Sequence, residues 1–122
     1  MSYDITIQSD DAHSQEVDLE ALKSFIRDIP DMNQEWETGF TYGDGARYYM
    51  EVDLEFAADN GNAESNPVRG RGTVNQINMH IPAANFHQDT VEGTPYAAIC
   101  LQIARHLGWW ALDLQTGEYL TG

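Results

Sequence analysis

The amino-acid sequence predicts an α+β fold, a two-layer sandwich in which two helices cover one face of about five mainly antiparallel strands. With 122 residues, 42% of them hydrophobic, the chain can bury one core. Several segments alternate apolar and polar residues as half-buried strands do, and two others carry apolar residues at helical spacing. The sequence shows no repeat or linker. We therefore expect residues 1–122 to form a single domain, in the order strand, helix, three strands, helix, strand.

The first strand and the first helix have clear signals. Apolar residues alternate with polar ones over residues 3–8, which predicts a half-buried strand. Apolar side chains then recur at helical spacing over residues 19–28. Asp18 can cap the start of this helix, and Pro30 prevents it from continuing.

A hairpin is expected next. Apolar residues alternate over residues 36–42 and again over residues 48–56, with the turn Gly-Asp-Gly between them. A three-residue turn at positions 43–45 would place Phe40 opposite Tyr48. Apolar side chains then meet throughout, which favours this register because a slip of one residue would invert the faces.

The other face of this hairpin carries acidic residues. In the expected register Glu37 lies opposite Glu51, and Glu35 lies opposite Asp53. Like charges that face each other across two strands destabilise a sheet by about 0.2–1 kcal/mol. If the helices cover the apolar face, the acidic face is open to solvent, and Tyr49 adds an aromatic side chain of the kind enriched among binding hot spots. We predict a partner-binding surface formed by Glu35, Glu37, Tyr49, Glu51, Asp53 and Glu55.

The second half of the chain supplies the remaining elements. Residues 57–72 are polar, glycine-bearing and aperiodic, which predicts a long loop. A strand is expected over residues 73–81. A helix begins after Thr94 and ends at Gly108, because threonine caps helix starts and glycine suits the left-handed position at helix ends. The short apolar segment 109–112 predicts the last strand.

The net charge of −14, from 6 basic and 20 acidic residues, is concentrated in the first half of the chain. Residues 1–64 hold 16 acidic and 3 basic residues, whereas residues 65–122 hold 4 and 3. Direct binding to nucleic acid or to an anionic membrane is therefore not expected, since both need clustered Lys and Arg. A basic protein is the expected partner, because a large acidic field speeds encounter with a positive surface. The segments 10–20 and 57–72 are alternative contact surfaces, and solubility alone would also account for the charge.

Residue types with catalytic or metal-binding chemistry are present, but not in tight motifs. His80, His87 and Asp89 have a His-x6-His-x-Asp spacing that a metal site can use, although a position in a surface loop is the simpler interpretation. The acidic alternation lacks the calcium-loop pattern. Cys100 falls within the buried pattern of the second helix, where cysteine acts as a small inert hydrophobe. We expect no catalytic residues, no cofactor and no metal.

The end of the chain resembles a recurring ending of small bacterial proteins. In segment 103–109, Ile-Ala-Arg-His-Leu-Gly-Trp, a helix ends at leucine-glycine-tryptophan. In segment 112–117, Leu-Asp-Leu-Gln-Thr-Gly, a strand closes with an aspartate-glutamine-threonine-glycine turn. This last quarter is similar to that of immunity proteins of polymorphic or contact-dependent toxin systems. The resemblance implies a bacterial cytosolic protein of the immunity type and assigns no functional residue.

Charge and resemblance together predict a non-enzymatic acidic binding protein that neutralises a basic protein, such as a nuclease toxin. It would cover the Lys and Arg residues with which the toxin holds nucleic acid. One alternative is a DNA mimic that inhibits a host restriction or CRISPR complex; another is a small metal-dependent hydrolase that uses His80, His87 and Asp89. A single cysteine, no secretion signal and no apolar run of membrane length predict a cytoplasmic protein.

Overall fold

The computed structural model describes the chain in six ranges, residues 2–10, 15–43, 48–57, 63–64, 72–82 and 93–120. Its elements in chain order are β1 (Ser2–Gln8), β2 (Val17–Asp18), α1 (Leu19–Arg27), β3 (Met32–Trp36), β4 (Gly39–Tyr42), β5 (Met50–Ala57), β6 (Ala63–Glu64), β7 (Thr73–Val74), β8 (Gln76–Pro82), α3 (Pro95–Leu107) and β9 (Trp110–Asp113).

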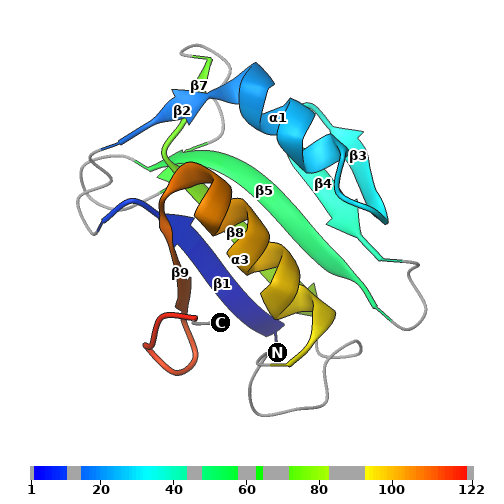
Figure 1. Cartoon of the computed structure of the whole chain (residues 1–122), viewed down its shortest axis with the longest axis vertical. Coiled ribbons are helices and arrows are strands. Elements are labelled where there is room, and N and C mark those ends of the chain that lie inside the picture. Colours follow the sequence, from blue (N-terminus) through cyan, green and yellow to red (C-terminus); the bar gives the residue numbers. More distant parts are fainter. Residues whose placement is uncertain are drawn as a thin grey trace.

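The strands form one large sheet and one small one. The large sheet follows the path β3-β4-β5-β8-β1-β9, and β6 pairs with the end of β5 (Figure 1). The small sheet joins β2 to β7. Every strand pairing among the described residues is antiparallel. From β5 to β9 the strands therefore alternate between the first and second halves of the chain, with β1 between β8 and β9.

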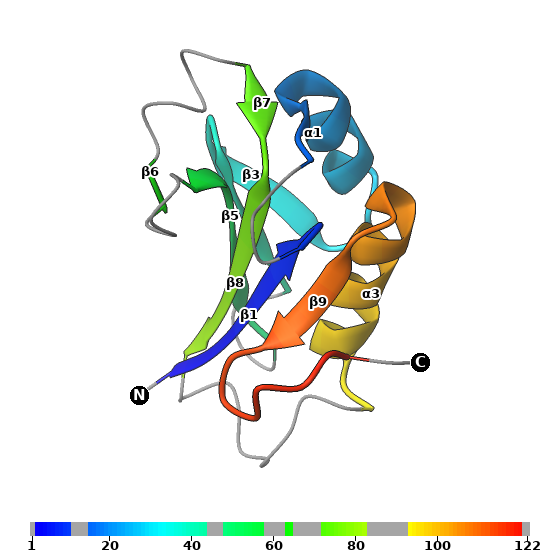
Figure 2. The same ribbon diagram turned by 90° about the vertical axis from the view of Figure 1, so that its left-hand side faces the viewer.

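Both described helices lie on the same side of the large sheet (Figure 2). This arrangement confirms the predicted α+β sandwich. The apolar positions of the alternating strands face the helices and are fully buried with them, as the alternation predicts. The largest of these core side chains are Ile5, Ile7, Leu22, Ile26, Phe40, Met50, Val52, Leu54, Ile77, Met79, Ile81 and Ile103.

The helix ends follow the predicted signals. The Asp18 carboxylate accepts a hydrogen bond of 2.9 Å from the backbone N–H of Ala21, which caps α1. The Thr94 hydroxyl accepts one of 3.4 Å from the N–H of Ala97 at the start of α3. Gly108 ends α3 with a φ of 71°, in the left-handed region that favours glycine.

The predicted strand over residues 36–42 is wrong. The chain turns at Glu37 and Thr38, so β3 and β4 are two strands that pair with each other. The prediction placed Trp36 on the buried face with Phe40, but the Trp36 side chain is 48% exposed. Its indole covers Gly39, where an added Cβ would meet the indole Nε1 at 2.0 Å. Glycine at this position lets the ring fold back over the turn.

The predicted register of the next hairpin is also wrong. Phe40 pairs with Val52 instead of Tyr48, four residues further along β5. The shift is even, so the side chains of β4 and β5 keep their predicted faces, because strand faces alternate with period two. The expected oppositions of Glu37 with Glu51 and of Glu35 with Asp53 do not form.

The loop predicted over residues 57–72 is only partly described by the structure. The loop expected over residues 57–72 includes Ala57, which ends β5, and β6, which pairs with it. Residues 58–62 and 65–71 lie outside the described part of the chain.

Neither α1 nor α3, the helices that the structure describes, has the length and apolar character needed to cross a bilayer.

Candidate functional site

The face of the large sheet that carries no described helix, termed here the open face, holds an acidic row. We define this row as Glu51, Asp53 and Glu55 of β5. The intervening residues Val52 and Leu54 are buried in the core, so the three carboxylates project from the opposite side of the strand. All three residues are half-buried. Neither described helix covers the predicted acidic face, and neighbouring residues leave the three carboxylates of the row partly exposed.

The acidic row has unfavourable electrostatics. Burial raises the pKa of the Asp53 carboxyl, and the charge of Glu51 raises it further, while His80 acts in the opposite direction. Burial also raises the pKa of Glu55, which hydrogen bonds from Gln76 and Asn78 partly offset. Desolvation and neighbouring like charges both disfavour the ionised form of a carboxyl group. A cation placed beside the row would relieve this repulsion.

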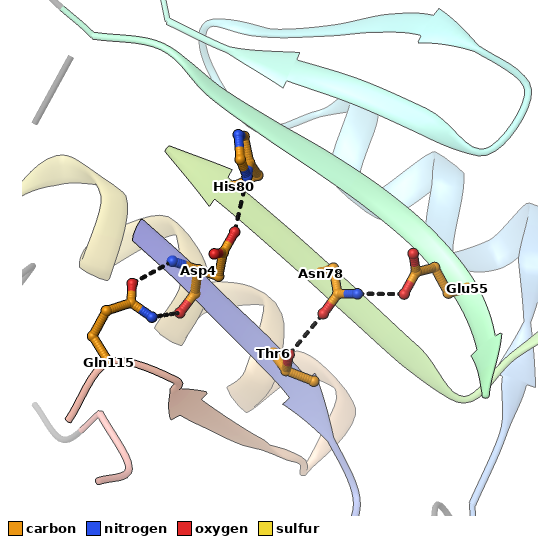
Figure 3. Close-up of polar contacts among 6 residues, drawn as sticks. All are labelled: Asp4, Thr6, Glu55, Asn78, His80 and Gln115. Carbon is orange, nitrogen blue, oxygen red and sulfur yellow. Dashed lines mark hydrogen bonds and ion pairs between the residues drawn. The ribbon is translucent and has the colours of Figure 1, made fainter. Parts of the chain in front are cut away.

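Polar side chains of β8 and β1 hold Glu55 in place. Glu55 Oε1 accepts hydrogen bonds from Gln76 Nε2 at 2.9 Å and from Asn78 Nδ2 at 2.5 Å. Asn78 Oδ1 in turn accepts a hydrogen bond of 2.6 Å from Thr6 Oγ1 (Figure 3). The chain of contacts crosses three neighbouring strands. It orients one carboxylate of the row and engages both the Nδ2 and the Oδ1 of Asn78.

A second polar group lies at the other end of the row. His80 pairs with Glu51 on one side and with Asp4 on the other in the strand ladders. Its Nδ1 lies 2.8 Å from Asp4 Oδ1. The Gln115 side chain brackets the Asp4 backbone, accepting from its N–H at 2.6 Å and donating to its carbonyl at 3.3 Å (Figure 3). The C-terminal turn thereby fixes Asp4 and its imidazole partner.

These groups surround a shallow hollow of about 350 Å³, termed here the acidic hollow. The hollow is lined by the four carboxylates of Asp4, Glu51, Asp53 and Glu55. The amide of Asn78, the imidazole of His80 and the exposed side chain of Leu114 complete the lining. The predicted partner-binding set included Glu51, Asp53 and Glu55 and lacked the other four, of which His80 was considered only as a metal ligand. Asp4, Asn78 and His80 occupy polar positions of correctly predicted strands, but their contact with β5 depends on the strand order.

The other predicted site residues lie around the hollow without lining it. Glu35 on β3 accepts a hydrogen bond of 2.9 Å from the hydroxyl of Thr41, the residue that pairs with Glu51. Tyr49 directly precedes β5. The pKa of its phenol is raised by burial first and then by the negative charges of Glu51 and Glu35. Glu37 is exposed in the turn between β3 and β4. Glu35 and Tyr49 therefore extend the acidic row sideways, whereas Glu37 lies at its margin.

Trp36 is an aromatic side chain beside the acidic row that the sequence prediction placed in the core. Asp53 pairs across the strands with Gly39, and the Trp36 indole covers Gly39 on that face. The only sequence signal for this packing was the short Glu-Thr-Gly segment after the tryptophan. Large exposed aromatic side chains are enriched at protein-binding surfaces.

The other chemical candidates do not form a second site in the described structure. Of the predicted group His80, His87 and Asp89, only His80 lies within the described residues, and it pairs with Asp4. Among the described residues, no three His, Cys, Asp or Glu side chains are arranged to hold a metal ion. Cys100 is fully buried in α3, and this burial raises the pKa of its thiol to about 12, so it is not a nucleophile.

Comparison with protein-family models, with curated proteins and with solved structures finds no match to this chain. The resemblance of segments 103–109 and 112–117 to immunity proteins therefore stays a prediction.

Proposed function

We propose that the protein is a non-enzymatic binding protein that neutralises a basic partner protein. More specifically, we propose a bacterial cytoplasmic immunity protein that inhibits a cognate toxin. The observation that carries the proposal is the acidic row, three half-buried carboxylates on one strand that line a hollow in the open face.

A basic side chain of a partner fits the chemistry of the acidic hollow. A Lys or Arg that enters it would meet Glu51, Asp53 and Glu55, and its charge would favour the ionised form of each carboxyl. Because the carboxylates are already partly desolvated in the free protein, less solvation is lost when the partner binds. Leu114 and Trp36 offer apolar contact at the edges of the same surface.

Inhibition would follow from occlusion. A nuclease holds the phosphate backbone with clustered Lys and Arg, and a protein surface of opposite charge competes for the same side chains. The net charge of −14 speeds the encounter of the two proteins. No chemical step is required of the inhibitor.

The proposal is tested with the protein encoded beside this one in the source genome, because an immunity gene adjoins its toxin gene. Co-expression should restore growth to cells that carry the toxin. In a binding assay at low salt, Glu51→Gln/Asp53→Asn should slow association by about tenfold, since two steering charges are lost from the contact.

The control is Glu20→Gln/Asp28→Asn. It removes the same two charges from exposed positions in and directly after α1, on the helix side of the sheet. This control should leave association within about twofold of the parent protein, since steering is strongest close to the contact. Equal slowing by both double variants would exclude the acidic row as the contact, and failure to bind or protect would exclude the immunity function.

A further inference from the structure

A tryptophan, a glycine and an aspartate lie in register across β3, β4 and β5. Trp36 pairs with Gly39 in one strand ladder, and Gly39 pairs with Asp53 in the next. Side chains of paired residues project to the same face of a sheet, with Cβ atoms about 4.5–5.5 Å apart. Because Gly39 has no side chain, the Trp36 indole lies over it, at the position that an added Cβ would take. The indole is therefore the neighbour of the Asp53 carboxylate on the open face.

Two carboxylates beside this indole have no donor. Within the described ranges, the side chains of Asp53 and Glu51 accept no hydrogen bond and form no ion pair, whereas two amide groups hold Glu55. Both are half-buried. A partly desolvated charge without a partner is unfavourable, so a cationic donor placed beside these two carboxylates would be stabilising.

The Trp36 indole is fixed in position and open to a partner. Its side chain is 48% exposed although it covers Gly39. The face of an aromatic ring attracts cations, and the planar guanidinium of arginine also stacks on it, which the ammonium of lysine cannot do. A guanidinium carries five N–H donors in its plane, so it can donate to carboxylates while its face rests on a ring. This combination favours arginine over lysine.

We propose that Trp36, Asp53 and Glu51 receive an arginine side chain of the basic partner protein. The guanidinium stacks on the indole and donates hydrogen bonds to the two carboxylates. The charge of the open face is complementary to this occupant, and the exposed ring selects it from the other basic side chains. This inference rests on the proposed function and makes it more specific, because it names the residue type that the partner presents.

Two peptides of equal charge test the proposal, one of four arginines and one of four lysines, both acetylated and amidated. Attraction to the net charge of −14 is the same for both. In NMR titrations of the ¹⁵N-labelled protein at low salt, the arginine peptide should bind about two- to fivefold more tightly, the range of one exposed cation–π contact. The Trp36 indole N–H signal, assigned by its loss in Trp36→Phe, should move as the arginine peptide saturates the protein. The signal of Trp109, whose indole nitrogen is buried, is the internal reference.

Trp36→Leu should abolish the preference for arginine, and Trp36→Phe, which keeps a ring, should retain part of it. The matched control is Trp110→Leu, which removes another exposed tryptophan, on β9, and should keep the full preference. The parent protein decides the proposal even where Trp36→Leu does not fold.

Equal binding of the two peptides to the parent, or a Trp36 signal that stays in place, would overturn the assignment of arginine. A preference abolished by Trp110→Leu instead of Trp36→Leu would overturn it too. These results leave the proposed function standing, because an acidic surface can neutralise a basic protein without selecting arginine. The proposed function fails separately, when the protein encoded beside this one is neither bound nor neutralised.

Discussion

Replacing Asp53 by asparagine should stabilise the protein. Asp53 lies between Glu51 and Glu55 on β5, two residues from each, which is about 7 Å along a strand. At that distance, two charges in a water-like dielectric repel by about 0.6 kcal/mol. Two such neighbours, partly offset by His80, give an expected gain of about 1 kcal/mol for Asp53→Asn at pH 7 and low salt. In a chain of this length that corresponds to about 3–5 °C in Tm.

The gain should depend on pH, with a sign set by the raised pKa of Asp53. The folded state holds the Asp53 proton more tightly than the unfolded state, so the parent loses stability as pH rises from the ordinary carboxyl value of 3.8 through the folded-state pKa. Below that ordinary value both states are protonated and the penalty is absent. Asp53→Asn should therefore exceed the parent in stability at pH 7 and match it at pH 3.

Urea unfolding at pH 7 and pH 3, followed by circular dichroism, measures both free energies. Glu118→Gln, at an exposed position after β9, is the control and should stay within about 0.5 kcal/mol of the parent. The reasoning is refuted if Asp53→Asn is less stable than the parent at pH 7, or if its advantage is the same at pH 3. Either result would mean that the acidic row is not under electrostatic strain.

Three other predictions concern stability. Ile103→Ala should lower the free energy of unfolding by about 2–5 kcal/mol because Ile103 is fully buried. Leu101→Ala should lower it by less because Leu101 is only partly buried, and urea unfolding of both variants measures the difference. Gly108→Ala should cost about 1 kcal/mol, since its φ of 71° disfavours a side chain although nothing lies near the added Cβ, and an unchanged Tm would contradict this. Moderate sodium chloride should raise the Tm of the parent by screening the acidic row, and by less in Asp53→Asn; a lowered parent Tm would count against the repulsion.

The sequence was sufficient for both described helices and for the faces of the residues along β1, β5 and β8. Helix caps at Asp18 and Thr94 are local hydrogen bonds between neighbouring residues, so they are readable from the chain itself. The alternation along β5 and β8 places every second residue on the open face whatever the register. For this reason Glu51, Asp53 and Glu55 were predicted correctly as one row even though their predicted cross-strand partners were wrong.

Tertiary structure decided which elements became neighbours. The break at Glu37 and Thr38 depends on the Trp36 indole packing over Gly39, and nothing in the alternation of residues 36–42 signals it. The pairing of β1 with β8 and β9 is long-range, so the sequence pattern could not bring Asp4 to the acidic row. Patterns of period two or 3.6 encode which face a residue takes, because that is local geometry. Strand order and register arise from the packing of the whole core, and they determined which polar groups the acidic hollow collected.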